Sequence, residues 1–421
     1  MRRPPVPAVL TGVLTAVAVL AAACGTSTSD GAGDAGAPAA TVDAPSALDD
    51  PTADGLPEPL VDPAELRSGG PPPDGIPPID EPSFLDVDEV DFLEPEEPVL
   101  ALEIGDDARA YPVQVLIWHE IVNDVVGGTP VAVTYCPLCN SALAFDRQVD
   151  DPVLDGGELT FGTSGMLYQS ALVMYDRQTE SLWSHFTGEA IAGVLTGTEL
   201  EQFTLTTVSW ADWSAQHPDG RVLSRDTGHD RDYGSNPYPG YDDVSSPPFM
   251  FEGEVDDRLA AKTRVVGAGR DDDPVAIVND ELQERGVVST SIDGRPVTVW
   301  SLPGTASALE EQSVSGGRDV GATAVFVAEH EGREPRVRAS RRTLRRDHHR
   351  IDLRHLRHRP RRTARGRGAP LPGARRHVLV RLGRLRTRDP RGPVTERPVP
   401  SRRARRHRFS ERGNTRECSE R

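Results

Sequence analysis

Two stretches of this sequence align with each other without a gap, residues 110–143 and residues 276–309. Position 110 meets position 276, so the offset is 166 residues. Both stretches contain a Gly-x-Pro-Val pattern, beginning at Gly128 and at Gly294, and both end in Ser-Ala-Leu. A repeat of this length indicates two similar modules rather than a solenoid of short units. We therefore expect an internal duplication and two copies of one fold.

The residues within each module favour short strands. Residues 99–104 and 108–113 flank Gly105-Asp106-Asp107, which is typical of a hairpin turn. Apolar residues at helical spacing predict a short helix over residues 113–122. Further strands are expected at residues 129–135, 141–148, 158–162, 172–176 and 182–186. The predicted fold class is mainly β with some short helices, as two similar β-rich modules of which the second is incomplete.

The first residues of the chain have the plan of an export signal. Arg2 and Arg3 precede an apolar stretch over residues 6–20, and three alanines then lead to Cys24. A positive start, an apolar stretch of this length and small residues at its end are typical of a secretory signal. A cysteine directly after the small residues resembles a bacterial lipoprotein signal, in which Cys24 would be lipidated. The alternative is a plain secreted protein with Cys24 beside the cleavage point.

Composition divides the chain into five segments. We expect a signal peptide at residues 1–23, a disordered tether at 24–71, a first β-rich module at 72–262, the start of a second at 263–330 and an Arg-rich tail at 331–421. The tether is rich in Ala, Asp, Pro, Ser, Thr and Gly, which cannot bury a core. The expected location is the extracytoplasmic face of the cell membrane, through the lipid anchor.

The Arg-rich tail contrasts with the rest of the chain. It contains 31 arginines and 9 acidic residues, which gives it a net charge of +22. Since the whole chain has a net charge of −18, the first 330 residues carry a net charge of −40. A body of that charge is a poor partner for nucleic acid or anionic lipid, and no nucleic-acid partner is expected. When stretches of the tail are back-translated with GC-rich codons and read one base further on, they give sequences typical of a β-rich globular protein. This favours a frameshift between about residues 328 and 343, and a disordered tail as written.

Several longer motifs give the chain a family resemblance. They lie at residues 75–77, 118–124, 131–139, 162–165, 175–183 and 224–228. On these motifs, residues 72–330 resemble the exported prokaryotic proteins of domain-of-unknown-function family 3179. Two residues depart from the usual pattern of that family, His185 in place of Gln and Gln169 in place of Asn. The resemblance implies a fold and an exported location, and it names no activity.

The cysteines of Cys136-Pro-Leu-Cys139 are the sharpest local signal for chemistry. Two thiols three positions apart can bind one metal ion, or form a structural disulfide in an oxidising compartment. A thioredoxin-type site needs the pair at a helix start in a βαβ setting, whereas this pair joins two expected strands. Covalent haem needs a His after the second cysteine, where Asn140 stands. The turn resembles the rubredoxin-type metal-binding turn most closely.

His119 is the predicted third metal ligand, because the helix before the cysteine-bearing strand carries it. The module alignment supports this prediction, because the second copy has none of the three predicted metal-binding side chains. The positions of His119, Cys136 and Cys139 correspond there to Arg285, Leu302 and Thr305. Thiolates with imidazole suit zinc and copper alike. A closed zinc site takes four ligands, and His185, His217 and His229 are candidates for the fourth, with no spacing argument for any of them.

These observations leave two functions open. The first is an uncharacterised extracytoplasmic lipoprotein with a soft-metal or thiol-redox site at Cys136, Cys139 and His119. The alternative is a non-enzymatic binding or structural lipoprotein whose two cysteines form a disulfide. A hydrolase has no motif behind it. The sequence names no reaction, and no protein or small-molecule partner.

Overall fold

The computed structural model describes residues 42–327, except residues 155, 254–255, 269–273 and 293. Within this part, nineteen strands form five sheets, and the α-helices are three elements of seven residues each. The predicted mainly β fold with short helices is confirmed. The predicted signal peptide with Cys24, the first part of the tether and the tail lie outside the described residues. None of the helices between residues 42 and 327 has the length and apolar character that a membrane span requires.

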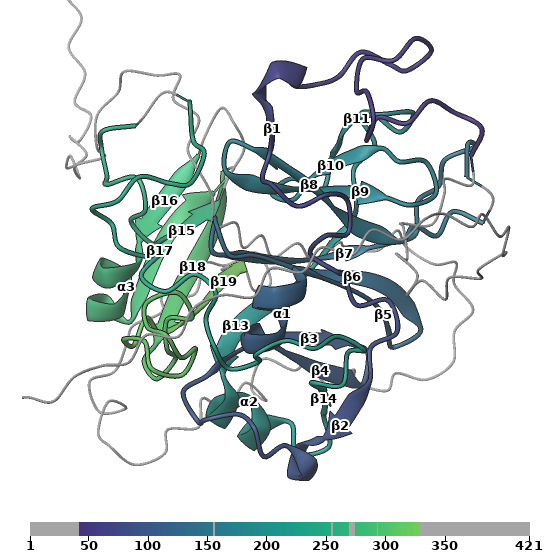
Figure 1. Ribbon diagram of the computed structural model, residues 1–421. Helices are drawn as coiled ribbons and strands as arrows, with labels where there is room; N and C mark the ends of the chain where they lie inside the picture. The colour runs from purple at the N-terminus through teal and green to yellow at the C-terminus, as the bar shows by residue number, and fades with distance from the viewer. Residues whose placement is uncertain (1–41, 155, 254–255, 269–273, 293, 328–421) are drawn as a thin grey trace, which may run out of the picture.

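Three sheets lie one above another in the first part of the chain (Figure 1). The upper sheet has the order β1 (Leu66–Ser68), β8 (Phe161–Tyr168), β9 (Ala171–Asp176), β10 (Leu182–Ser184), β11 (Ala190–Ala192). The central sheet has the order β12 (Gln202–Phe203), β7 (Ser141–Asp146), β6 (Thr129–Cys136), β5 (Ile121–Val126). The lower sheet has the order β13 (Leu205–Ser209), β3 (Pro98–Ile104), β4 (Asp107–Pro112), β14 (Arg221–Leu223), β2 (Phe84–Asp86). All neighbours are antiparallel except β14 and β4.

Strand alternation explains why the central sheet is buried on both faces. In β6, Val131, Val133 and Tyr135 belong to the core shared with the lower sheet and with α1 (Val113–His119). Ala132 and Cys136, of opposite parity, belong to the core shared with the upper sheet. Successive side chains of a strand point to opposite faces, so one strand contributes to two cores. The thiol of Cys136 therefore points between the central and upper sheets.

Helix α2 (Trp210–Gln216) covers the outer face of the lower sheet. Ser209 caps it, accepting a hydrogen bond from the Asp212 N–H at 3.2 Å. Trp210 and Trp213 are buried and stack with ring centroids 5.9 Å apart. Both tryptophans therefore belong to the core between α2 and the lower sheet.

The outer face of the upper sheet is covered by residues that the sequence assigned to the tether. Strand β1 pairs with β8, and a short 3₁₀ helix, η1 (Pro63–Glu65), precedes it; the other 3₁₀ helix, η2 (Val87–Glu89), follows β2. Ala47 is fully buried against Val173 and Tyr175 of β9. From residue 42 onward, the segment thus packs on the sheet instead of forming a free tether, because its few apolar residues match the apolar outer face of β9.

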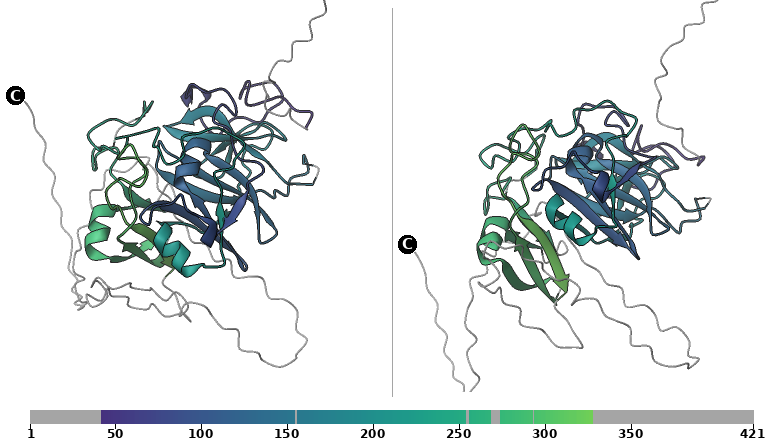
Figure 2. Two further views of the ribbon diagram at one scale, coloured as in Figure 1. Left: turned by 60° about the horizontal axis from the view of Figure 1, so that its bottom comes forward. Right: turned by 90° about the horizontal axis from the view of Figure 1, so that it is seen from below.

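The second module lies beside the three layers, as both views in Figure 2 show in green. It contains the pair β15 (Val265–Ala268) and β16 (Val275–Val278), helix α3 (Asn279–Arg285), and the sheet β17 (Val287–Ile292), β18 (Arg295–Leu302), β19 (Ala322–Val327). Helix α3 and strands β17 and β18 begin and end 166 residues after α1, β5 and β6. The register of β17 on β18 also repeats that of β5 on β6. The two modules share an order of elements, and their origin by duplication stays a prediction.

The connection after β6 differs from the equivalent connection after β18. Four residues, 137–140, join β6 to β7, whereas residues 303–321 join β18 to β19. The long connection crosses to the first module, where Leu309 and Val314 are buried in the core beside α1. The backbone N–H of Ala306 also donates to the carbonyl of Glu96 at 2.8 Å. The second module therefore contributes side chains to the core of the first.

Candidate metal centre

The two cysteines lie on the turn between β6 and β7 in the central sheet. Cys136, the last residue of β6, is 1% exposed and pairs with Ser141, the first residue of β7. Cys139 is half-buried, and neither thiol is in a disulfide. The turn closes through Asn140, whose φ of 45° lies in the left-handed region that Asn tolerates better than most residues. The predicted placement of the pair between two strands is confirmed.

His185 is the histidine that the fold brings to the cysteines. It follows β10 in the upper sheet, and its backbone N–H donates to the carbonyl of Leu172 at 3.3 Å. The ligand atoms of Cys136, Cys139 and His185 all lie within 4.8 Å of one another. His185 is 1% exposed, and its Nε2 is buried without a hydrogen-bond partner in the described structure. A buried ring nitrogen without a partner is costly, and a bound cation would satisfy it.

Ser141 connects the members of this cluster. Its Oγ lies 3.1 Å from Cys139 Sγ and 3.4 Å from His185 Nδ1. Burial raises the pKa of the Cys136 thiol well above its usual value, and burial lowers the pKa of His185. Both groups therefore stay neutral unless a cation replaces the thiol proton. A reactive free thiol needs a lowered pKa, so these surroundings disfavour redox catalysis at Cys136.

His119 lies in a different place from the one predicted. Its Nδ1–H donates to the carbonyl of Pro77 at 2.7 Å, so its Nε2 accepts from the hydroxyl of Tyr233 at 2.6 Å. Burial lowers the pKa of His119 to about 4, which fits a neutral ring with both nitrogens engaged. Its ring centroid is 5.4 Å from that of the exposed His229. The structure joins the two cysteines to His185, and it does not bring His119 or His229 into that cluster.

Glu120 is an unforeseen neighbour of the cluster. Helix α1 ends at His119, earlier than the predicted residue 122, because Glu120 takes a φ of 59° and turns the chain into β5. The residue is 6% exposed. Burial, with the nearby Cys136 as the second cause, raises the pKa of Glu120 well above its usual value. The equivalent residue 166 positions later is Gly286, with a φ of 70°. Glycine adopts this conformation without strain, whereas Glu120 does so at a cost.

Fold and site together define a layered β protein with a buried cysteine–histidine cluster between two of its sheets. The family model described as "Protein of unknown function (DUF3179)" matches residues 73–359, and the chain belongs to this family. The match confirms the resemblance and extends into residues 331–359 of the predicted out-of-frame tail; the frameshift itself stays a prediction. No curated protein matches the chain. No solved structure matches it either.

Proposed function

We propose that this protein is an extracytoplasmic, lipid-anchored member of its family that binds one soft metal ion through Cys136, Cys139 and His185. The observation that carries the proposal is the convergence of two thiols and a buried imidazole whose Nε2 lacks a partner. Two sulfur ligands and one nitrogen ligand suit zinc or copper(I). His119 has no part in the proposal, because both of its ring nitrogens are engaged elsewhere.

The set of three ligands has a chemical consequence. A structural zinc site has four protein ligands, whereas a catalytic zinc site has three and keeps one position for water or substrate. Cys139 is less buried than Cys136 and borders a cavity, so an additional ligand would reach the ion from the side of Cys139. The proposed site is therefore accessible to a small molecule and is not a closed structural site.

Metal analysis of the full chain, purified after export from a bacterial host, tests the proposal. We expect about one equivalent of zinc or copper in the wild-type protein. His185→Gln keeps a polar side chain of similar size and removes the imidazole. It is expected to weaken metal binding at least ~10-fold, as is the double variant Cys136→Ser/Cys139→Ser.

The exposed His229→Gln variant is the matched control, since it removes a histidine outside the cluster. It should retain the full equivalent of metal. Thiol titration of the denatured protein accompanies each metal measurement. Wild-type protein with neither metal nor free thiols would point to a structural disulfide and overturn the proposal. Full metal retention in His185→Gln and in the double cysteine variant would also overturn it.

The lipid anchor is tested separately at Cys24. If Cys24 is lipidated after removal of the signal, the mature protein should incorporate labelled fatty acid and sediment with the membrane fraction. Cys24→Ser should abolish labelling and release the protein into the soluble fraction. Equal labelling of both proteins would contradict lipidation at this residue, and an unlabelled secreted wild-type protein would favour the plain secretory signal.

A further inference from the structure

A cavity of about 190 Å³ borders the cysteine turn. Cys139 and Asn140 from the turn and Phe186 from the segment after β10 form one side. The rest of the lining comes from Leu138, from positions between 241 and 265, and from Ala276, Leu309 and Arg318. This volume is below the 300–1,000 Å³ typical of sites for drug-sized ligands, so it suits a smaller molecule.

The lining is cationic, although the chain as a whole carries a net charge of −18. Its charged side chains are Arg258, Lys262, Arg264, Arg318, Asp242 and Asp256, which is an excess of two positive charges. Arg258 pairs with Asp256 at 2.5 Å, and Arg318 pairs with Asp242 at 2.9 Å. The two remaining cations, Lys262 and Arg264, have no carboxylate within 4.0 Å among the residues described.

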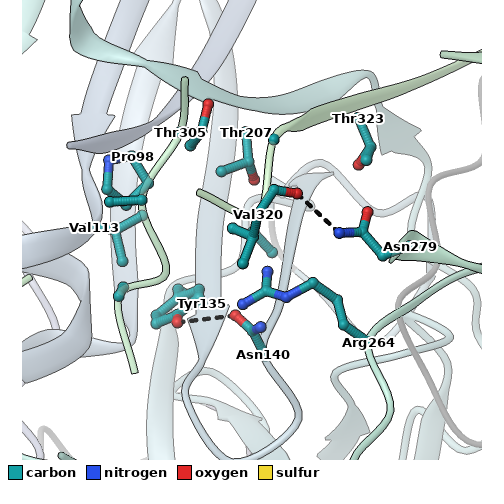
Figure 3. A pocket seen from close by; sticks show the side chains of 14 residues that line it. Pro98, Val113, Tyr135, Asn140, Thr207, Arg264, Asn279, Thr305, Val320 and Thr323 are labelled. Atoms are coloured by element: carbon teal, nitrogen blue, oxygen red, sulfur yellow. Dashed lines mark hydrogen bonds between the residues drawn. The ribbon is translucent and has the colours of Figure 1, made fainter. Parts of the chain in front are cut away.

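Among the residues that the structure describes, Arg264 has only neutral hydrogen-bond partners. The amide of Asn140, with its oxygen turned toward the guanidinium, accepts from Nη2 at 2.7 Å and from Nη1 at 3.0 Å. Ser307 Oγ lies 3.4 Å from Nη2, and Nε is buried without a partner. Figure 3 shows the side chain extending toward Asn140 and Tyr135 along a smaller cavity of about 50 Å³, which it also lines. A cation held by neutral groups at a cavity wall leaves its charge available to an anion.

Lys262 is the second cation without an ion-pair partner in the described part of the chain, and Asp242 and Asp243 act on it from more than 4.0 Å away. Its Nζ donates to the carbonyl of Tyr241 and to Ser246 Oγ, both at 2.5 Å, and it lies 4.4 Å from the centroid of the Tyr241 ring. Phe186, Phe251 and Leu309 supply apolar surface to the same cavity. The combination of two cations outside the ion pairs of the described residues with apolar walls matches a molecule that carries an anionic group on an apolar body.

We infer that this cavity binds a small organic carboxylate, with Arg264 and Lys262 as the groups that hold the carboxylate and the apolar walls as the surface for its body. A ligand in this position lies next to Cys139. The inference does not rest on the metal site, because every residue that it uses lies outside Cys136 and His185 and the anion needs no metal to bind.

Calorimetric titration of the full chain with benzoate, in the presence of a metal chelator, tests the inference. We expect benzoate to bind and benzyl alcohol, its neutral analogue, to bind at least ~10-fold more weakly, because a charge-assisted hydrogen bond is worth about 1.5–3 kcal/mol. Arg264→Met should weaken benzoate binding by a similar factor. Lys262→Met should do the same, and it removes a half-buried side chain whose loss the fold tolerates more easily.

The matched control is Arg285→Met, which makes the same change in charge on the exposed face of α3. It should bind benzoate like the wild type. Absence of benzoate binding, equal binding of benzyl alcohol, or wild-type affinity in folded Arg264→Met and Lys262→Met proteins would each overturn the inference. Circular dichroism and a cooperative thermal transition establish that each variant is folded.

Discussion

Replacing Asp176 by alanine is expected to lower the free energy of unfolding by about 3–5 kcal/mol. Asp176 is fully buried at the end of β9. Its carboxylate accepts hydrogen bonds from the Thr179 N–H at 2.6 Å, from Thr179 Oγ1 at 2.9 Å and from Trp183 Nε1 at 2.8 Å. The Thr179 hydroxyl also has Ser181 Oγ as a partner at 2.8 Å, but alanine would leave the Thr179 N–H and the Trp183 Nε1–H buried and unpaired, and each costs about 1–3 kcal/mol.

Loss of the Asp176 hydrogen bonds should also affect the core and the candidate site. Trp183 is fully buried and packs edge-to-face on Phe161, with ring centroids 5.6 Å apart. It precedes His185 by two residues, so the Asp176 network holds the strand that presents the histidine. Urea denaturation measures the effect. Asp219→Ala, which changes an exposed aspartate, should alter the free energy of unfolding by no more than about 0.5 kcal/mol. A similar small change in Asp176→Ala would refute this account of the network.

Replacing Glu120 by glycine is expected to have the opposite effect and raise the free energy of unfolding by about 1–3 kcal/mol at neutral pH. Glycine removes the strain of a φ of 59° and removes a largely buried carboxyl group. The greater freedom of glycine in the unfolded chain offsets about 0.5–1 kcal/mol of this gain. Denaturation of the metal-free protein measures the difference.

The gain should depend on pH in a defined direction. The folded-state pKa of Glu120 is raised above its usual 4.5, so folded protein holds a proton that the unfolded chain has released. Stability therefore falls as the pH rises from about 4.5 toward the folded-state pKa. The stability advantage of Glu120→Gly over the wild type should grow over this range. Glu120→Gln keeps the strained backbone, so its stability relative to the wild type should rise with pH in the same way but without the gain from relieved strain.

The equivalent position in the second module supplies the reciprocal control. Gly286→Ala places a side chain at a φ of 70° and should lower the free energy of unfolding by about 1 kcal/mol. A Glu120→Gly protein less stable than the wild type would show that the glutamate makes a stabilising interaction. A more stable variant would identify Glu120 as a residue retained at the expense of stability, as is common near functional sites.

Local patterns in the sequence predicted much of the fold. Alternation over β6, the turn at Gly105 and the repeat at offset 166 anticipated strands, a hairpin and matching elements within one or two residues. The stacking of three sheets was not predictable, because it depends on which strand faces which across the cores. Residues 42–71 were assigned to a tether because their composition is polar, and their few apolar contacts with β9 are a tertiary effect.

The candidate site was predictable only where its residues are close in sequence. Cys136 and Cys139 share one turn, whereas His185 reaches them through the packing of the upper sheet on the central sheet. His119 is nearer in sequence, and its helix directs it toward Pro77 and Tyr233 instead. A usable signal existed for Glu120, since the alignment sets it opposite a glycine directly after a helix, where a left-handed residue is common.

The crossing of residues 303–321 into the first core bears on how such a protein can change over evolutionary time. The three cluster residues are encoded in the first module, while most of the cationic cavity wall is encoded after residue 256. A lineage that altered its second module would keep the cysteines, the histidine and Lys262, yet lose Arg264 from the cavity wall. Because Leu309 and Val314 of the crossing segment are buried in the first core, such changes also act on the module that holds the cysteines, and the two binding capacities are not inherited independently.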